Sequence, residues 1–265
     1  MAGLTNKSIA SAYKSLLRVD DDTNGIDTAA EFITDGEGTK SALKLSDDVV
    51  QILPQNDDTT TTFAVKSNSG TTLLTADTTN SVIKAGVGQF NVLNNYAYFG
   101  ITSTGSANYL ANEHYAICFG NETGASAQSD ISFGTGTDPA DTFTTSDTTD
   151  FHASNIVPMM WFVPDNIAID SVTSIEGANQ PTGDTTRMHL KSFTFTSGST
   201  SCLTAGELLA HNSDVTNAGN EQAYKTTWTV DQASVTGGKV ILAFFRQDSD
   251  DSDYSLSVVI KYHLV

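Results

Sequence analysis

The chain has 265 residues, and its charges are strongly unbalanced, because 13 basic residues face 31 acidic ones for a formal net charge of −18. This charge repels phosphate backbones and anionic lipid headgroups, which argues against nucleic-acid binding and membrane insertion. Charged residues make up only 17% of the chain, and the polar remainder is mostly Thr, Ser, Asn and Gly, a mixture that favours strands and turns over helices.

Residues 1–24 are predicted to form a helical anchor. The stretch from Asn6 to Val19 contains neither Pro nor Gly, and its apolar residues recur at helical spacing: Ile9, Tyr13, Leu16 and Leu17. An isolated helix of this length is marginal in water. Its apolar stripe therefore needs a partner, either the rest of the chain or another protein, and these four residues are the candidates for attachment.

The same N-terminus lacks the uninterrupted apolar core of a signal peptide, and no stretch of the chain approaches the length of a membrane span. We therefore expect synthesis in a cytoplasm without export by the usual route. The surface chemistry is nevertheless typical of extracellular proteins. Assembly into a particle inside a cell, followed by release through lysis, reconciles the two observations.

The stretch DDDTNGIDTAAE, from Asp20 to Glu31, matches the calcium-loop pattern of an EF-hand, with Asp22 and Asn24 at ligand positions and Gly25 at the sharp turn. An EF-hand also needs a helix on each side of the loop, whereas the residues that follow, FITDGEGT, contain two glycines and several β-formers. We interpret the stretch as a solvated turn and predict no metal site. Calcium binding remains the alternative.

Residues 25–90 are predicted to form a small β shaft. Short strand candidates alternate with turn signals at roughly ten-residue spacing: SALKL, VVQIL, TTFAV, TTLLT and SVIKA. Large apolar residues are few, too few for the core of an independent monomeric domain of about 60 residues. Intertwining or stacking with sister chains, as in a homotrimeric shaft, would complete such a core.

Residues 91–265 are predicted to form an antiparallel β-sandwich or jelly roll. Eight strand candidates of ordinary length are joined by polar connections rich in Gly and Asn, among them HYAICFG, RMHLKSFTFT, GKVILAFFRQ and YSLSVVIKYHLV. The loop from Gly134 to Asp150 is expected to be exposed. The segment from Leu203 to Asp214 is expected to hold one helical turn, and the acidic run from Asp248 to Asp253 is expected to be a hairpin tip. The whole chain is thus predicted to be mainly β.

No catalytic constellation can be recognised. The five histidines are scattered and form no HExxH, and neither a GxSxG elbow nor a GxGxxG loop is present. Carboxylates are too numerous for a glycosidase-type pair to be identified. Cys118 and Cys202 are far apart and are interpreted as reduced thiols. We predict no enzyme activity, no catalytic residue and no cofactor.

Several strings resemble a known family. KSIASAYKSLLRVDDDTNGI, DGEGTKSALKLSDD and FAVKSNSGTTLLTADTTNSVIKAG are similar to the N-terminal module of tailed-phage virion proteins, especially those of marine phages. GDTTRMHLKSFTF, LLAHNSDVTNAGNEQ and VILAFFRQDSDDSDYSLSVVIKYHL resemble their C-terminal half. The resemblance covers most of the chain. It implies a virion structural component, fibre-like or associated with head or tail, that is a homotrimer with an N-terminal attachment part and a distal β head.

The expected function is therefore a virion surface protein, a trimeric fibre or knob bound to capsid, portal or tail proteins and engaging the host. A host surface glycan is one candidate receptor, and Tyr96, Tyr98 and Tyr109 are candidates either for its binding or for the core. One alternative is a head decoration protein that stabilises the capsid. Another is a free carbohydrate-binding or hydrolytic β domain, against which the missing signal peptide and the thin shaft argue.

Overall fold

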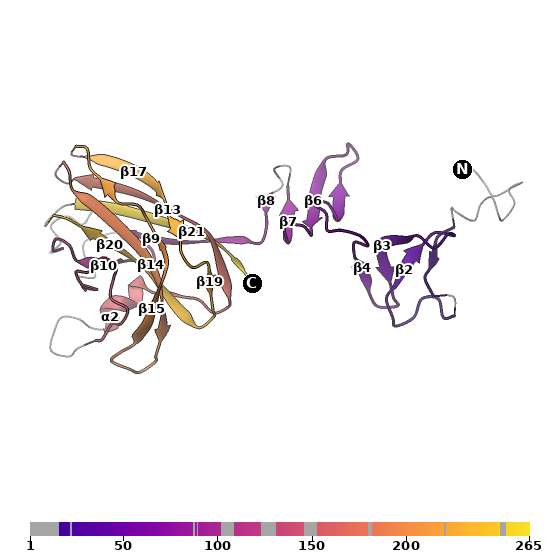
Figure 1. Cartoon of the computed structure of the whole chain (residues 1–265), viewed down its shortest axis with the longest axis horizontal. Helices are drawn as coiled ribbons and strands as arrows, with labels where there is room; N and C mark the ends of the chain where they lie inside the picture. The colour runs from indigo at the N-terminus through magenta and orange to yellow at the C-terminus, as the bar shows by residue number, and fades with distance from the viewer. Residues whose placement is uncertain are drawn as a thin grey trace, which may run out of the picture. The chain divides into compact units, whose positions relative to one another are not determined.

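The computed structural model describes residues 16–21, 23–86, 88, 90–101, 109–122, 131–145, 153–179, 182–219, 221–249 and 253–265. Within these residues the chain is mainly β, as predicted, and no helix reaches seven residues. All strand pairs are antiparallel except that between β9 and β11. The chain divides into two compact units, residues 1–93 and 94–265, which Figure 1 shows and which are described separately below.

The first sheet of unit 1 is a single antiparallel layer in the order β1 (Arg18–Val19), β2 (Glu31–Thr34), β3 (Lys40–Leu45) and β4 (Val50–Ile52). Asp35 fixes the turn between β2 and β3, because its carboxylate accepts hydrogen bonds from the backbone N–H groups of Glu37 and Thr39, each at 2.9 Å. Gly38 completes this turn at φ +85°, a conformation that favours glycine.

The structure corrects the predicted N-terminal helix at its end. Residues 6–15 of that helix lie outside the described residues, but Leu16 and Leu17 are not helical and Arg18–Val19 forms strand β1. Val19 lies opposite Ile33 of β2. Pairing with β2 supplies the backbone hydrogen bonds that a last helical turn would have made, and β-branched Val19 suits a strand.

The second sheet of unit 1 is also a single antiparallel layer, in the order β5 (Phe63–Lys66), β6 (Thr72–Asp77), β7 (Val82–Ala85) and β8 (Phe90–Asn91). Asp77 and Lys84 form an ion pair at 2.7 Å between β6 and β7. The hydrogen bonds that Lys84 and Asn80 donate to Asp77 lower the pKa of its carboxyl to about 2. The charges of Asp77 and Lys84 are thus paired within the sheet itself.

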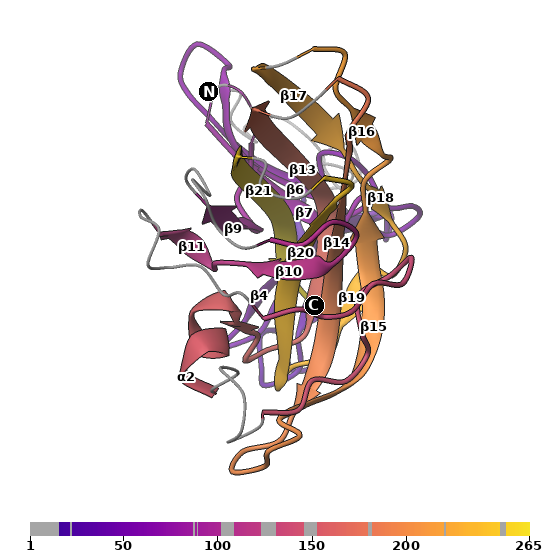
Figure 2. The same ribbon diagram turned by 90° about the vertical axis from the view of Figure 1, so that its left-hand side faces the viewer.

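Unit 2 contains two large sheets. The first has the order β11 (Gly120–Glu122), β9 (Asn94–Ile101), β21 (Asp253–Leu264), β13 (Ile167–Asn179) and β17 (Gln222–Thr227), with β19 (Ser234–Val235) pairing β13. The second has the order β10 (His114–Ile117), β20 (Lys239–Gln247), β14 (Thr185–Phe195), β15 (Leu203–His211) and β18 (Thr229–Val230), with β12 (Trp161–Phe162) pairing β20 and β16 (Val215–Thr216) pairing β14. Figure 2 shows β20, β14 and β15 next to one another in this second sheet.

Both faces of the second sheet are largely buried at its central strands β20 and β14. One face packs against the first sheet, and both sheets contribute side chains to the core between them, including Phe99, Val172, Met188 and Phe245. The other face is covered by residues 131–143 and by the short helices α2 (Ala153–Ile156) and η3 (Val157–Met159), which form a second core with Phe193 and Phe244. This double burial explains why KVILAFFRQ is apolar almost throughout rather than alternating.

Two further predictions about unit 2 are wrong. The segment from Leu203, predicted to hold a helical turn, forms strand β15 as far as His211, because it pairs with β14 over most of its length. The acidic run after Gln247 is not a hairpin tip, because β20 and β21 belong to different sheets. It instead connects the two sheets. Both outcomes depend on tertiary pairing that local propensity does not encode.

Candidate functional site

The first sheet of unit 1 exposes an apolar face. Residues directly opposite each other on antiparallel strands point to the same side. Leu43 lies opposite Ile52, and Leu45 lies opposite Val50, so these four side chains share one face of the sheet. Val50 is 70% exposed and the two leucines are only half-buried. Glu31, opposite Leu45 on β2, is half-buried beside them.

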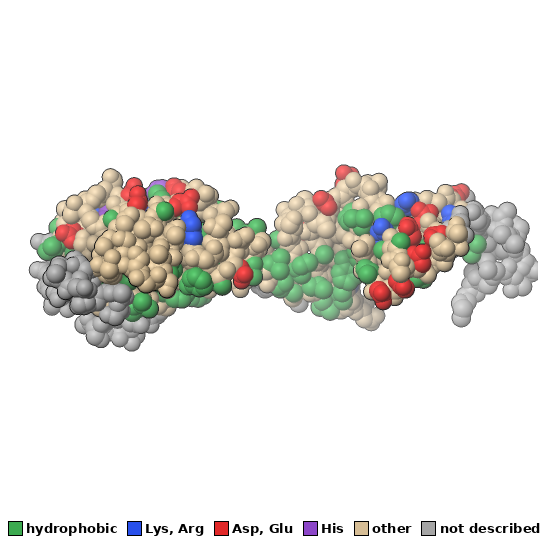
Figure 3. All heavy atoms as spheres, turned by 90° about the horizontal axis from the view of Figure 1, so that it is seen from below, with side chains coloured by type: hydrophobic (Ala, Val, Ile, Leu, Met, Phe, Trp, Pro, Cys, Tyr) green, Lys and Arg blue, Asp and Glu red, His purple; other side chains and the backbone are tan. Residues whose placement is uncertain are grey.

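The second sheet of unit 1 exposes a wider apolar face. Its members occupy opposed positions on three strands: Phe63 with Ala76, Val65 with Leu74, Leu74 with Ala85, and Ala76 with Ile83. Phe63 and Val65 are each 41% exposed, and the other four are half-buried. Figure 3 shows hydrophobic side chains gathered over this part of the chain. A single layer with one apolar face in water is unstable unless another layer covers that face.

The residues predicted for particle attachment lie only partly within the described chain. Ile9 and Tyr13 lie outside the described residues. Leu16 and Leu17 lie just before β1, and both are exposed. Their exposure is compatible with attachment, which remains a prediction.

The residues of the calcium-loop pattern are directed to other partners. Asp20 forms an ion pair with Lys40 at 3.0 Å. Glu31 lies in β2, so a strand stands where an EF-hand has its second helix. Asp22 lies outside the described residues. Within the described part of the chain, no group of three or more His, Cys, Asp or Glu side chains could hold a metal ion.

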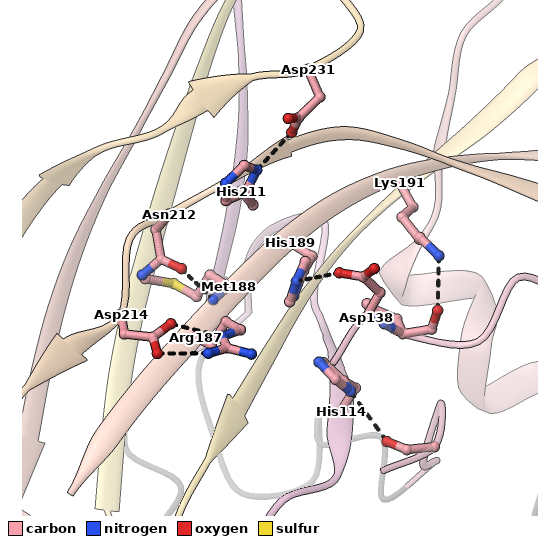
Figure 4. Close-up of polar contacts among 12 residues, drawn as sticks. His114, Asp138, Arg187, Met188, His189, Lys191, His211, Asn212, Asp214 and Asp231 are labelled. Atoms are coloured by element: carbon pink, nitrogen blue, oxygen red, sulfur yellow. Dashed lines mark hydrogen bonds and ion pairs between the residues drawn. The ribbon is translucent and has the colours of Figure 1, made fainter. Parts of the chain in front are cut away.

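A polar cluster lies on the outer face of β14 in unit 2, where Arg187, His189 and Lys191 alternate with core residues (Figure 4). Arg187 donates hydrogen bonds to both carboxylate oxygens of Asp214, at 2.7 and 2.6 Å. These bonds raise the pKa of Arg187 and lower that of Asp214. The buried ammonium group of Lys191 donates to the carbonyl oxygen of Pro139 at 2.8 Å and also pairs with Asp141.

Two buried imidazoles lie next to this cluster. The rings of His114 on β10 and His189 on β14 have centroids 5.1 Å apart. His114 Nδ1 is 3.2 Å from the carbonyl oxygen of Gly134, and His189 Nε2 is 3.1 Å from Asp138. Among the described residues, His114 Nε2 and His189 Nδ1 have no hydrogen-bond partner. Burial lowers the pKa of each imidazole to about 4, so both are neutral at pH 7.

A pocket of about 310 Å³ that opens to solvent lies over the cluster, lined in part by Asp138, Arg187, His189, His211 and Asp214. Arg187 and Lys191 each pair with a carboxylate, and the carboxylate of Asp138 lies against the neutral ring of His189. The described histidines, which exclude His152, contact carboxylate or carbonyl oxygens and no Ser, Thr or Cys hydroxyl or thiol. The arrangement therefore works as a hydrogen-bonded support between β14 and residues 131–141, and it contains no nucleophile paired with a histidine.

Another buried titratable group lies inside unit 2. Val172, Ser174 and Glu176 alternate on the core-facing side of β13, and all three are buried. Trp228 Nε1 donates a hydrogen bond to Ser174 Oγ at 2.9 Å. The two carboxylate oxygens of Glu176 have no hydrogen-bond partner among the described residues. Burial raises the pKa of Glu176 to about 8, so a carboxyl group inside the core is largely protonated at neutral pH.

Gly206→Ala is expected to destabilise unit 2 by about 1–3 kcal/mol, the usual cost of overpacking. A Cβ at Gly206 in β15 would lie 2.8 Å from the ring of Phe193 and 2.9 Å from the backbone of Asp141. Gly177→Ala in β13 is the matched control, because a Cβ there meets nothing within 4 Å. Urea unfolding of both variants checks this result, and equal stabilities would contradict the close packing at Gly206.

The aromatic candidates for glycan contact divide into two groups. Tyr96 and Tyr98 on β9 are exposed, at 55% and 46%. Tyr109 is buried, with its ring against Tyr115 and Phe245, and therefore belongs to the core. The described part of the Gly134–Asp150 loop is largely exposed but anchored by the buried ring of Phe143. Cys118 and Cys202 are both buried free thiols.

Comparison with known proteins found no matching family model and no matching curated protein. Among the described residues, no helix has the length and apolar character that crossing a membrane requires.

Proposed function

We propose that the chain is a bacteriophage virion surface structural protein. In this proposal it is a homotrimeric fibre or knob, joined to capsid, portal or tail proteins by its N-terminal region. Unit 2 is the β head that contacts the host. The protein has no catalytic role in this proposal, and the particle that carries it is assembled in the host cytoplasm and released by lysis.

The observation that carries the proposal is the pair of uncovered apolar faces in unit 1. Val50 in the first sheet and Phe63 in the second are exposed on layers too thin to fold around a core of their own. A protein that displays such faces is built for assembly, and a shaft of several chains covers them. The sequence resemblance to fibre-like virion proteins points in the same direction.

The strand order of unit 2 adds support from a different part of the molecule. The orders β9-β21-β13-β17 and β10-β20-β14-β15, in which successive strands other than β14 and β15 lie in different sheets, support an eight-stranded jelly roll. We therefore assign unit 2 to the jelly-roll class of sandwiches, an architecture found in viral capsid and lectin domains. For host contact, exposed Tyr96 and Tyr98 are the aromatic side chains that we assign to a surface glycan.

The test is gold-labelled antibody raised against residues 94–265 and imaged on intact virions. Label confined to tail or vertex appendages is the expected result, and the same antibody should then block adsorption. Label distributed over the whole head would replace the fibre with a decoration protein, and the stability of capsids lacking the chain would then be measured. Antibody that binds disrupted and intact particles equally poorly would remove the virion assignment and favour a free carbohydrate-binding domain.

A further inference from the structure

Unit 1 is built from one module used twice. Strands β2, β3 and β4 begin at residues 31, 40 and 50, and β5, β6 and β7 begin at 63, 72 and 82, so each start recurs 32 residues later. β2 and β5 have the same length, as do β3 and β6. The register of the second hairpin also recurs. Lys44 lies opposite Gln51 in the first module, and the residues 32 positions later, Ala76 and Ile83, lie opposite each other in the second.

The first turn of the module is the same in both copies. The backbone N–H of Gly38 donates to the carbonyl oxygen of Asp35 at 3.1 Å, and that of Gly70 donates to Ser67 at 2.9 Å. Both glycines have φ +85°. A side-chain oxygen of the first turn residue, Asp35 or Ser67, also accepts a hydrogen bond from the residue after the glycine, at 2.9 and 3.1 Å. Two segments with the same strand bounds, turn and hairpin register are a tandem structural repeat.

The two copies differ in which face is apolar. The first module places Leu43 and Leu45 on its apolar face, but the equivalent positions 32 residues later are Thr75 and Asp77 on the polar face of the second module. The apolar residues of the second module, Leu74 and Ala76, correspond to Ala42 and Lys44 of the first. The modules therefore present apolar surfaces on opposite sides of a common frame.

The chemistry of these faces selects the kind of partner. The acidic chain repels another copy through most of its surface, since its net charge is −18. On the apolar face of the second module the charged residue is Lys66, which lies opposite Thr72, whereas Asp77 and Lys84 pair on the opposite side. In the first module, Lys44 likewise lies on the side opposite Leu43 and Leu45. Glu31, opposite Leu45, is the carboxylate on the apolar face of the first module, and the described strand residues on the apolar face of the second module carry none. Copies of this chain therefore bring few carboxylates together at these faces.

The repeat itself favours a copy over an unrelated protein. Repeated units that cannot bury an apolar face alone are stabilised by stacking on similar units. An unrelated partner would need two separate sites, one for each of two differently composed faces. A second copy supplies both modules at the same 32-residue spacing, and one symmetry operation brings each module to its counterpart.

We propose that each 32-residue module covers its apolar face with the same module of other copies of the chain. Unit 1 is then a homotypic assembly interface with two contact regions, one for each module. This inference rests on the proposed function, whose shaft it assigns to specific residues. The first module contributes Leu43, Leu45, Val50 and Ile52 to this interface, and the second module contributes the face around Val65 and Leu74.

The test compares charge insertion on the two sides of the same strands in the full chain. Val50→Asp and Val65→Asp place a carboxylate on the apolar faces. Gln51→Asp and Ala64→Asp place it on the neighbouring residue, on the opposite side. Sedimentation velocity over a dilution series measures assembly. Fluorescence of Trp161 and Trp228, the two tryptophans of the chain, reports separately that unit 2 is folded.

We expect the wild type and the two control variants to sediment as oligomers. Val50→Asp and Val65→Asp should raise the dissociation constant about tenfold or more, with tryptophan fluorescence unchanged. A monomeric wild type, or apolar-face variants that assemble as well as their controls, would overturn the proposal. Virion labelling distinguishes the proposed function from the proposed interface. If the chain assembles through these faces but no particle is labelled, the virion function alone is removed. If particles are labelled but the apolar-face variants assemble normally, the interface alone is removed.

Discussion

Replacement of Glu176 by Gln is expected to stabilise unit 2 by about 3 kcal/mol at pH 7. Burial without a hydrogen-bond partner raises the pKa of this carboxyl from 4.5 to about 8, and each pKa unit corresponds to about 1.4 kcal/mol. As the pH rises above 4.5, the unfolded chain ionises this group while the folded chain holds it protonated, so stability falls until about pH 8. Gln has a similar shape and no charge. Urea unfolding between pH 4.5 and 8.5 measures the difference.

The gain from Glu176→Gln should shrink toward zero as the pH falls to 4.5 and below, because the wild-type carboxyl then becomes protonated in the unfolded chain as well as in the folded one. Glu207→Gln is the control, because Glu207 is an exposed residue paired with Lys239 at 3.3 Å and such pairs contribute about 1 kcal/mol or less. An unchanged or lower stability of Glu176→Gln at pH 8 would mean that this carboxylate is ionised and solvated in the folded protein.

Acidification from pH 6.5 to 4 is expected to destabilise unit 2 by on the order of 5 kcal/mol through His114 and His189. Burial is the main reason that the pKa of each imidazole falls from 6.5 to about 4. Arg187 lowers the pKa of both imidazoles further, Arg246 lowers that of His114, and Asp138 raises both. The stability that these neutral imidazoles provide is complete above pH 6.5 and is lost as the pH falls through 4, because the unfolded chain binds the protons first.

The double variant His114→Phe, His189→Phe tests this assignment. The informative quantity is the slope of the unfolding free energy against pH, and a change in overall stability at pH 7 does not alter that comparison. We expect the variant to lose most of the wild-type slope between pH 6.5 and 4. A slope equal to that of the wild type would show that other groups, such as carboxylates, carry the acid sensitivity. With Glu176 acting in the opposite direction, the wild-type head should be most stable near pH 6.5.

The mainly β character could be predicted from the sequence because it depends on local composition. Strand candidates such as TTLLT and GKVILAFFRQ correspond to β6 and β20. Predictions failed where long-range pairing decides the outcome. Arg18–Val19 is recruited by β2, and Leu203–His211 by β14, against local patterns that suggested helix. The connection after Gln247 was misjudged because a sequence does not tell which sheet each strand joins.

The candidate sites were less accessible to sequence reasoning. The 32-residue repeat was missed because few residues are identical between its copies, chiefly Gly38 with Gly70 and Thr39 with Thr71, and because the apolar phase is reversed. The spacing of the GT pairs was the signal that could have revealed it. His114 and His189 are 75 positions apart in number, and only the pairing of β10 and β14 with β20 brings their rings together.

The most direct test of the account is the molar mass of the intact chain in solution, measured by sedimentation equilibrium at micromolar concentration. The proposed homotrimer, in which sister chains cover the apolar faces of unit 1, predicts a mass about three times the 28.1 kDa of one chain. A mass of 28.1 kDa at every concentration would contradict it, because the faces around Val50 and Val65 would then be stable in water without a partner.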